Sequence, residues 1–377
     1  MKQKLFNHIK NIPGWKSKRK IVLFSVDDYG NVRLDSQKAR KELDKAGLKV
    51  STRFDAYDTL ETKEDLEQLF EILNSVKDAH EKPAVFTPYA LPCNIDFERI
   101  KSEEQREYFY ELLPQTFSKL EDLQTKAYLG TWPLWLEGIN KGFLKPQFHG
   151  REHLNLVVFK EKLKTKDKDL MVNLENRSYT SIEAKNYEPI GYTAAFSFRN
   201  QDDQKDFPDL METGLDAFEK VFGYPATVFT PPAGQFPVTL EGSLSELGLQ
   251  HLDKPFYTAR HLGNDQYKKE INVLGFDHKS NLTWLVRNVV FEPTDDRGLD
   301  WVTYTFQQVE AAFFWGKPAN ISSHRVNFCG HIDPKNRAKG LGALKELLKR
   351  IVQKWPEVEF MSADALGDLI LEERRRD

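Results

Sequence analysis

Two adjacent carboxylates, Asp27 and Asp28, stand directly after a short apolar run. The run, residues 21–26, is interrupted only by Ser25, and it predicts a strand that is buried on both faces. Gly30 then predicts a turn. Because neighbouring side chains of a strand point to opposite faces, one aspartate can bind a metal ion while the other stays free to act as a base. The alternative is a solvated turn, since aspartate is a common turn residue.

Two histidines, His149 and His153, are spaced four residues apart. If they share a helical turn, both imidazoles project from one face and can bind one cation. Two histidines and one carboxylate, with coordination positions left open, are typical of a catalytic metal site, and the aspartates above offer that carboxylate. The same segment also matches the inverted zinc-peptidase motif, in which Glu152 is the base. A surface or capping role for the two histidines is the remaining alternative.

Two further predicted strands end in residues that could take part in catalysis or ligand binding. Residues 318–324 predict a strand that ends in His324, and residues 226–230 predict another strand. The turn after the second strand, residues 231–234, has the sequence Pro-Pro-Ala-Gly and can present backbone N–H groups to a ligand. Taken singly, His324 is better explained as a core or rim histidine, and the turn as an ordinary loop.

The elements around these residues alternate between strands and helices. Strands are predicted at residues 20–30, 83–87, 146–149, 226–230, 282–291, 318–324 and 358–361. Helices are predicted at 36–47, 64–79, 154–163, 208–222, 238–248, 301–315 and 339–352. This alternation favours an α/β fold with parallel strands, in which functional groups gather where the strands end. The charged residues 95–130 and the polar residues 160–190 are expected to be insertions.

The composition is that of a soluble protein with a large core: 377 residues, 40% hydrophobic and 29% charged, with a net charge of −3. Nothing in this balance favours nucleic acid as a partner. No stretch approaches the roughly 18 apolar residues of a membrane span, and the N-terminus lacks the apolar core of a signal peptide. Cys93 and Cys329 lack metal-binding spacing and fit a reducing compartment. We therefore expect a cytoplasmic protein, with residues 20–377 forming one domain.

Residues 1–20 hold seven basic residues and no acidic one. Within them, four apolar residues can form one face of a short helix: Leu5, Phe6, Ile9 and Ile12. Two interpretations follow. Residues 1–19 form a solvated basic leader, or residues 2–20 make a weak peripheral contact with an anionic membrane. The oligomeric state cannot be predicted from the sequence.

The order of these segments resembles that of the polysaccharide deacetylases, which form the NodB-homology superfamily and carbohydrate esterase family 4. The resemblance rests on the strand ending in Asp27 and Asp28, the histidine pair 149–153, the turn 229–234, the pair Asp300-Trp301 and the strand ending in His324. It spans residues 20 to about 370, motif by motif, with long insertions between the motifs. It implies a distorted (β/α)7 barrel of parallel strands.

The resemblance also implies roles for individual residues. Asp27 corresponds to the catalytic base and His324 to the general acid. The ligands of a divalent metal ion, expected to be Zn²⁺, are Asp28, His149 and His153. The expected substrate contacts are Tyr29, Thr230, Pro231, Pro232, Ala233 and Trp301. The implied activity is removal of an acetyl group from an N- or O-acetylated sugar in glycan or envelope metabolism. The alternatives are a non-catalytic carbohydrate-binding or scaffold protein and the zinc peptidase.

Four positions depart from the family pattern. Tyr29 stands where a glycine usually follows the two aspartates, and Gly150 replaces the usual hydroxyl residue after the first histidine. Thr230 stands where the family has an arginine that pairs with the catalytic aspartate, and Ala233 replaces an aromatic residue. The metal-binding set is therefore complete, while the partner of Asp27 and the sugar contacts are expected to differ. This combination predicts an unusual substrate or a weak activity.

Overall fold

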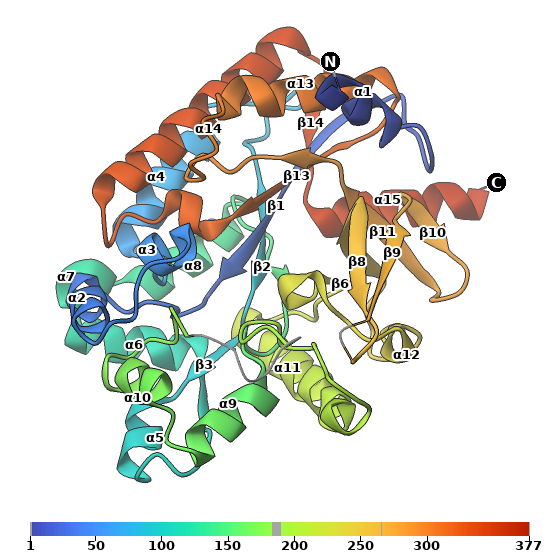
Figure 1. Ribbon diagram of the computed structural model, residues 1–377. Helices are drawn as coiled ribbons and strands as arrows, with labels where there is room; N and C mark the ends of the chain where they lie inside the picture. The colour runs from blue at the N-terminus through green and yellow to red at the C-terminus, as the bar shows by residue number, and fades with distance from the viewer. Residues whose placement is uncertain (1, 183–189, 265, 377) are drawn as a thin grey trace.

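Seven parallel strands wind into a distorted barrel at the centre of the molecule (Figure 1). The computed structural model describes residues 2–182, 190–264 and 266–376. The barrel strands are β1 (Lys20–Tyr29), β2 (Phe86–Ala90), β5 (Gln147–Phe148), β6 (Val228–Phe229), β7 (His251–Pro255), β11 (Leu282–Arg287) continued by β12 (Val289–Val290), and β13 (Ala319–His324). This architecture confirms the predicted (β/α)7 class.

The barrel closes through a broken strand rather than through one continuous ladder. β11 pairs in parallel with β7, and β12 pairs in parallel with β13 on the opposite side. Only Asn288 separates β11 from β12. Its side-chain amide donates to the carbonyl of Pro318 (2.9 Å), and its side-chain oxygen accepts the backbone N–H of Asn320 (2.9 Å). These side-chain bonds replace ladder bonds at the junction, so the strand predicted at 282–291 is interrupted there.

Two short strands extend this sheet without joining the barrel. β14 (Val358–Phe360) pairs in parallel with the start of β1, and β10 (Gly275–Asp277) pairs antiparallel with β11. A separate hairpin, formed by β8 (Tyr257–His261) and β9 (Tyr267–Ile271), follows β7. The sequence analysis does not predict this hairpin.

Helices surround the barrel and connect its strands. The connection from β1 to β2 contains α2 (Gln37–Lys45), α3 (Arg53–Tyr57) and α4 (Lys63–Asn74). The later part of the chain forms α13 (Trp301–Phe314), the 3-10 turn η3 (Arg325–Phe328), α14 (Pro334–Lys354) and α15 (Ala363–Arg376). Local chemistry sets their ends: Thr62 and Asp65 form a capping box at the start of α4. No helix among the described residues is long and apolar enough to cross a bilayer.

A long excursion leads from β2 to β5 and covers the predicted insertion at 95–130. It consists of the hairpin β3 (Cys93–Ile95) and β4 (Tyr110–Leu112) and the helices α5 (Phe97–Ser102), α6 (Leu113–Leu123), α7 (Thr125–Tyr128) and α8 (Thr131–Asn140). Phe117 of α6 and Trp135 of α8 are fully buried in the main hydrophobic core. The excursion is therefore packed against the barrel.

The chain between β5 and β7 contains α9 (Leu156–Lys164), α10 (Lys168–Glu175), η1 (Asp202–Gln204), α11 (Phe207–Phe222), η2 (Pro232–Gly234) and α12 (Val238–Glu241). The sequence predicts no helix in residues 168–175, yet α10 buries Leu170 and Leu174. The rest of the predicted insertion includes residues 183–189, which lie outside the described residues. The helix predicted at 238–248 is confined to the four residues of α12.

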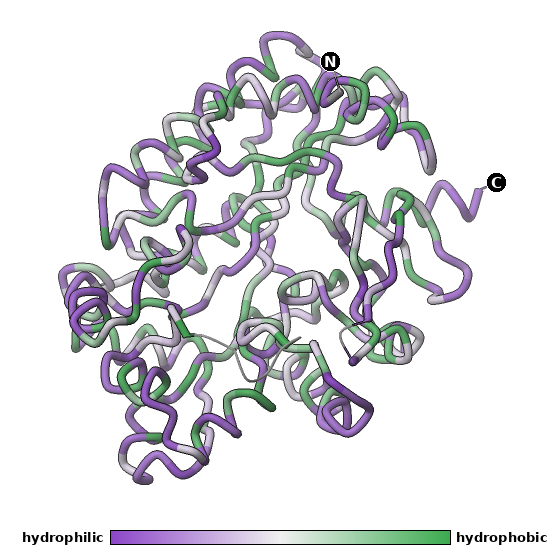
Figure 2. The backbone as a smooth tube through the Cα atoms, in the orientation of Figure 1, coloured by the Kyte–Doolittle hydropathy of each residue, from purple (hydrophilic) through white to green (hydrophobic). Residues whose placement is uncertain are grey.

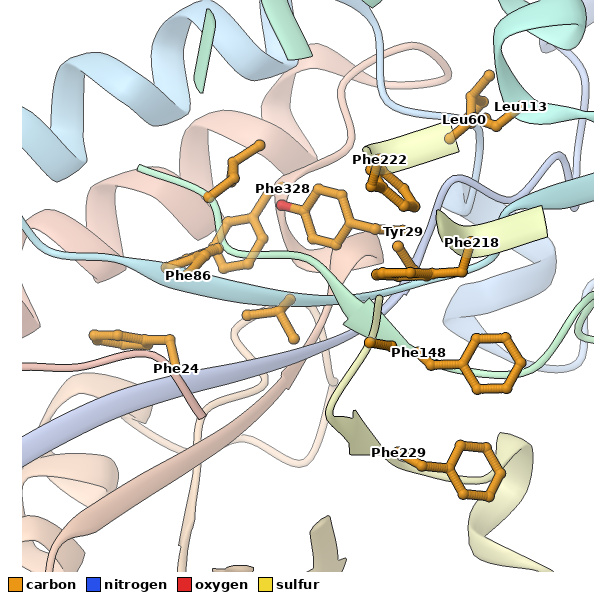
Figure 3. Close-up of a cluster of buried hydrophobic side chains, with 14 of the residues drawn as sticks. Phe24, Tyr29, Leu60, Phe86, Leu113, Phe148, Phe218, Phe222, Phe229 and Phe328 are labelled. Carbon is orange, nitrogen blue, oxygen red and sulfur yellow. The ribbon is translucent and has the colours of Figure 1, made fainter. Parts of the chain in front are cut away.

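Aromatic side chains fill the space between the strands and helices (Figure 3). The ring of Phe148 lies 5.6 Å from that of Phe229 and 6.1 Å from that of Phe218, and Phe24 stacks on Phe86 at 5.3 Å. Rings of this size contribute much of the buried area of a core. The first contact links β5 to β6 at their carboxyl ends, and the stacked pair links the middle of β1 to the start of β2. Hydrophilic residues gather on the outer turns of the helices (Figure 2).

Candidate metal centre and catalytic site

A bulge at the end of β1 directs both aspartates into one cavity. β1 continues through Asp27 and Asp28 to Tyr29, and its register with β2 shifts between Val26 and Tyr29. Asp28 has a φ of 73°, a left-handed conformation that is costly for a residue other than glycine. A bulge re-aims the side chains that it contains. Both carboxylates therefore line the same cavity of about 410 Å³, instead of facing opposite sides of the sheet.

The two histidines reach this cavity from a loop. β5 ends at Phe148, and residues 149–153 are irregular, so the predicted helical turn is wrong. Gly150 has a φ of 102°, and a Cβ at this position would lie 3.3 Å from Cγ of Pro232, which explains why no hydroxyl residue stands there. The loop still brings Nε2 of His149 to 3.5 Å and Nε2 of His153 to 3.2 Å from the Asp28 carboxylate. The three side chains therefore lie together, and their role as metal ligands stays a prediction.

The chemistry of these three residues fits a divalent cation. One ligand atom from each of Asp28, His149 and His153 lies within 4.8 Å of the others. Nδ1 of His149 donates to the backbone carbonyl of Thr230 (2.7 Å), which leaves the lone pair on Nε2. That Nε2 is buried and has no hydrogen-bond partner. Burial lowers the pKa of His153 to about 4, so this imidazole is neutral at physiological pH, as a metal ligand must be.

Asp27 is held as a carboxylate by Arg287 of β11. The two Nη atoms of the guanidinium donate to the two oxygens of Asp27 at 2.5 and 2.8 Å. Burial opposes ionisation of Asp27, but the charge and hydrogen bonds of Arg287 outweigh it, and its pKa lies below the usual range. Nε of Arg287 also donates to Asp253 (3.0 Å). The arginine missing at Thr230 is therefore supplied by another strand.

His324 lies near Asp27 and has a carboxylate partner of its own, Glu292. Nδ1 of His324 is 2.6 Å from Glu292, and Nε2 is 3.8 Å from Asp27. Burial opposes protonation, but Glu292 and the aspartates outweigh it and raise the pKa of His324 to about 9. Glu292 is in turn fixed by Arg53 (2.9 Å) and Asn327 (2.7 Å). A protonated imidazole is thus available near neutral pH.

Sequence reasoning missed both Arg287 and Glu292. Each carried a signal, because Arg287 is a charged residue inside the apolar segment predicted as the strand 282–291, and Glu292 directly follows that segment. Charged groups at such places are candidates for a site at the carboxyl ends of parallel strands. Which groups they pair with depends on contacts between distant strands.

The proposed substrate contacts divide into two groups. Thr230, Pro231 and Ala233 line the cavity, and Ala233 has a φ of 55°. Thr230 uses its hydroxyl to bond the carbonyl of Asp253 (2.9 Å). Pro232 is buried and packs behind the turn, beside Gly150. The cavity wall also contains residues that the sequence analysis did not select, namely Arg33, Phe54, Thr193, Gly234, Pro255, Arg287 and Ser322.

Tyr29 and Trp301 do not line the cavity, so their predicted contact with substrate must be corrected. Tyr29 is 1% exposed, and its ring packs edge-on against Trp135 at 5.8 Å. Trp301 is 4% exposed and its indole N–H points to the carbonyl of Asp295 (3.4 Å). Both side chains belong to the main hydrophobic core. The bulge that turns Asp28 into the cavity leaves the next residue facing the core.

The geometry disfavours the inverted zinc-peptidase motif. That motif needs its histidines and glutamate on one helix, whereas residues 149–153 form a loop. Glu152 is engaged in a two-pronged ion pair with Arg151 (2.6 and 2.8 Å), and it does not line the cavity. A carboxylate bound in this way is poorly placed to accept a proton from water.

Comparisons with known proteins give structural likeness only. No protein-family model and no curated protein matches the chain. A protein of Mycobacterium smegmatis assigned as a polysaccharide deacetylase is 11% identical, with 96% of this chain and 94% of that chain covered and a TM-score of 0.45. A GH57-type branching enzyme from Pyrococcus horikoshii is 8% identical over 93% and 70%, with a TM-score of 0.46. The peptidoglycan deacetylase PdaC from Bacillus subtilis is 11% identical over 95% and 94%, with a TM-score of 0.34. Similarity this low leaves the activity to be argued from the residues of the chain itself.

Proposed function

We propose that this chain is a metal-dependent hydrolase that removes an acetyl group from an acetylated sugar. The observation that carries the proposal is the presence, in one cavity, of three candidate metal ligands and a separate pair of proton-transfer groups. Asp28 belongs to the ligands, and Asp27 and His324 form the pair. A hydrolase needs both sets within reach of one substrate bond.

The residues of the chain divide the work of hydrolysis between them. A bound divalent cation, expected to be Zn²⁺, polarises a carbonyl group and lowers the pKa of water. Asp27, ionised by Arg287, accepts the proton of the attacking water. His324, protonated beside Glu292, donates a proton to the leaving nitrogen or oxygen. The products are acetate and a free amine or hydroxyl group. We assign the backbone N–H of Ala233 as a donor to the oxyanion.

The cavity supports a small polar substrate. Its volume of about 410 Å³ lies in the usual range for small-molecule sites. Phe54 provides an aromatic face in the wall, and charged or polar side chains form most of the remaining lining. An acetylated sugar combines a ring that can pack on an aromatic face with hydroxyl groups that need polar partners.

The decisive experiment measures metal content and acetate release on one purified preparation. We expect one divalent metal ion per chain and acetate release from an N- or O-acetylated sugar. Asp27→Asn should keep the metal and lose turnover. Sugar binding without turnover by the metal-loaded protein would support a non-catalytic carbohydrate-binding protein instead. Peptide cleavage that disappears in Glu152→Gln would support the peptidase.

A further inference from the structure

Arg33 is a cation in the cavity wall that lacks an anionic partner. It follows β1 in a loop, and its guanidinium carbon lies 4.9 Å from the centre of the Phe54 ring. Nε of Arg33 is buried without a hydrogen-bond partner, and no carboxylate of the described chain forms an ion pair with this side chain. Arg33 as a whole is half-buried, so its guanidinium carries a charge that no ion pair within the described chain engages and that a ligand in the cavity can reach.

The carboxylates near Arg33 are bonded to other groups, although Oδ2 of Asp58 has no hydrogen-bond partner among the described residues. Asp55 accepts hydrogen bonds from Thr180 (2.7 Å) and from residues around its own helix start, and Asp58 accepts from Arg325 (2.7 Å). Both feel the charge of Arg33 without bonding to it. The other cations of the cavity differ from Arg33, because Arg287 pairs with Asp27 and Asp253, and His324 pairs with Glu292. Arg33 therefore presents to the cavity a guanidinium that no direct ion pair with a described carboxylate engages.

We propose that Arg33 forms an anion subsite, which binds a carboxylate or phosphate group carried by the acetylated substrate. This inference rests on the proposed function and adds the class of substrate to it. A guanidinium group matches both anions because its parallel N–H groups bind two oxygens at once. The contact with the Phe54 ring restricts the guanidinium and so lowers the entropy lost when it binds an anion.

The test compares three sugars that differ in charge: N-acetylglucosamine, its 6-phosphate, and the corresponding N-acetylated uronic acid. Turnover is measured on the metal-loaded enzyme, and binding is measured separately by calorimetry on the metal-free full chain, where a metal cannot attract the anion. We expect at least one anionic sugar to bind about tenfold more tightly than the neutral sugar, with a matching decrease in KM. The better of the two anionic sugars identifies the anion.

The variants are chosen to separate charge in the cavity from charge elsewhere. Arg33→Met should abolish the preference for the anionic sugar, and Arg33→Lys should retain part of it. The matched control is Arg99→Met, because Arg99 is exposed and also stacks on a phenylalanine, Phe109, at 3.9 Å, outside the cavity.

The possible outcomes distinguish the two proposals. An equal preference in wild type and Arg33→Met, or no anion-dependent binding at all, overturns the subsite. Turnover without anionic preference overturns the subsite and leaves the hydrolase intact. Anionic preference that depends on Arg33, without turnover of any of the sugars, supports the subsite and counts against the hydrolase.

A second and independent observation concerns α1 (Lys2–Ile9), which packs with its polar face inward. Two polar residues on this face, Asn7 in the helix and Asn11 just beyond its end, are 3% and 1% exposed. The apolar residues Leu5, Phe6, Ile9 and Ile12 are 61%, 46%, 47% and 47% exposed. This is the reverse of the usual amphipathic pattern, in which the apolar face packs on the core.

Polar contacts explain why this orientation holds. Asn11 accepts a hydrogen bond from Asn288 (2.7 Å) at the junction between β11 and β12, and Lys10 donates to Gln308 of α13 (3.0 Å). The segment therefore satisfies polar groups at the seam of the barrel, beside α13 at the edge of the molecule (Figure 1). Next to it, Phe314 at the end of α13 is 73% exposed, and its ring lies 5.4 Å from His8.

We propose that this apolar face docks on an anionic lipid bilayer. The argument for this occupant is charge: the segment 1–20 contains seven basic residues and no acidic one, although Lys10 is buried and Arg19 pairs with Glu359. Lys4, Lys16 and Lys18 are exposed, and none of them forms an ion pair with a described carboxylate. Exposed apolar side chains flanked by lysines are typical of peripheral binding to anionic membranes.

The test is cosedimentation with phosphatidylcholine vesicles that contain or lack phosphatidylglycerol. We expect salt-sensitive binding to the anionic vesicles, reduced at least tenfold in the double variant Leu5→Gln/Ile9→Gln. The control Leu123→Gln/Leu129→Gln replaces leucines that are 59% and 58% exposed elsewhere and should bind as wild type. Equal binding by both double variants, or no binding by wild type, overturns the proposal. A concentration-dependent dimer lost only in the first variant would assign the face to a second copy of the chain.

Discussion

The cavity has one half around Asp28, with His149 and His153, and another half around Asp27, with His324. The polar groups of these two halves are satisfied in opposite ways. Around Asp28, Nε2 of His149 has no hydrogen-bond partner among the described residues, and the ligand atoms of the three residues lie within 4.8 Å of one another. Around Asp27, both oxygens are bonded by Arg287, and His324 is bonded by Glu292. The donor set of the first half fits a divalent cation, whereas the polar groups of the second half are bonded by other side chains of the chain itself.

The two halves also differ in how the backbone builds them. The ligand half depends on local irregularity: the bulge at Asp28 and the loop after β5 with its left-handed Gly150. The proton-transfer half depends on regular strands, since β1 pairs with β13 in a register that places Asp27 opposite His324. A metal site with open coordination positions needs ligand side chains that turn out of the sheet. A side chain with a fixed protonation state needs partners that are held at a constant distance.

The largest expected effect is that of Asp28→Asn. Loss of a ligand carboxylate should weaken binding of Zn²⁺ by more than about a hundredfold, since even outer-shell partners contribute 10–100-fold. Acetate release should disappear with the metal. Metal content after dialysis and a metal titration measure the effect. Full retention of the metal by Asp28→Asn would contradict the assignment of metal binding to the half of the cavity around Asp28.

Asp27→Asn should affect turnover without affecting the metal. Removal of a general base typically costs about 10²–10⁴-fold in rate. We expect a decrease of this size in kcat with an unchanged metal content, measured on the same preparation. If this variant loses the metal while Asp28→Asn keeps it, the two assignments are reversed.

Arg287→Met should have the largest effect on stability within the proton-transfer half. It leaves Asp27 and Asp253 buried without their shared cation, and breaking a buried ion pair costs roughly 3–5 kcal/mol. Urea unfolding measures the loss. Arg297→Met, in which the lost ion pair is more exposed, should cost less than about 1 kcal/mol. Equal losses in the two variants would contradict the special role of Arg287.

Glu292→Gln should change how stability depends on pH. The pKa of His324 is raised to about 9 from 6.5, so its protonation stabilises the folded state fully below pH 6.5, and this contribution is lost as the pH rises through about 9. Its size is at most roughly 3.5 kcal/mol, because one pKa unit corresponds to about 1.4 kcal/mol. The free energy of unfolding of the metal-free protein, measured from pH 6 to 10, should show this decline in wild type and a flatter curve in Glu292→Gln. The control Glu246→Gln replaces an exposed glutamate and should behave as wild type.

The smallest effect is expected for Trp301→Phe, which tests the corrected assignment of that residue. Trp301 lies in the core, so KM for the acetylated sugar should stay within about twofold, with a modest loss of stability from the smaller side chain. Phe54→Leu, in the cavity wall, should raise KM more than Trp301→Phe does. The reverse order would return Trp301 to the substrate site.

The sequence by itself indicated the strands that carry Asp27, Asp28, Thr230 and His324, and the three residues that converge on one point, but it did not indicate β7, which contributes Pro255 to the cavity wall. Apolar runs, strand ends and the spacing of histidines are local features, so they survive without knowledge of the fold. The apolar face and the basic charge of residues 2–20 are also local features that the sequence shows. The sequence does not show that this apolar face points outward.

Only the tertiary structure decided how Asp27 is held and which face each side chain takes. Arg287 lies 260 residues from Asp27 in the chain, and their contact depends on the closure of the barrel and the register of its strands. A single bulge residue decides that Asp28 faces the cavity while Tyr29 faces the core. Because strand side chains alternate with a period of two, a shift of one residue exchanges the two faces, and that shift is set by pairing with a distant strand.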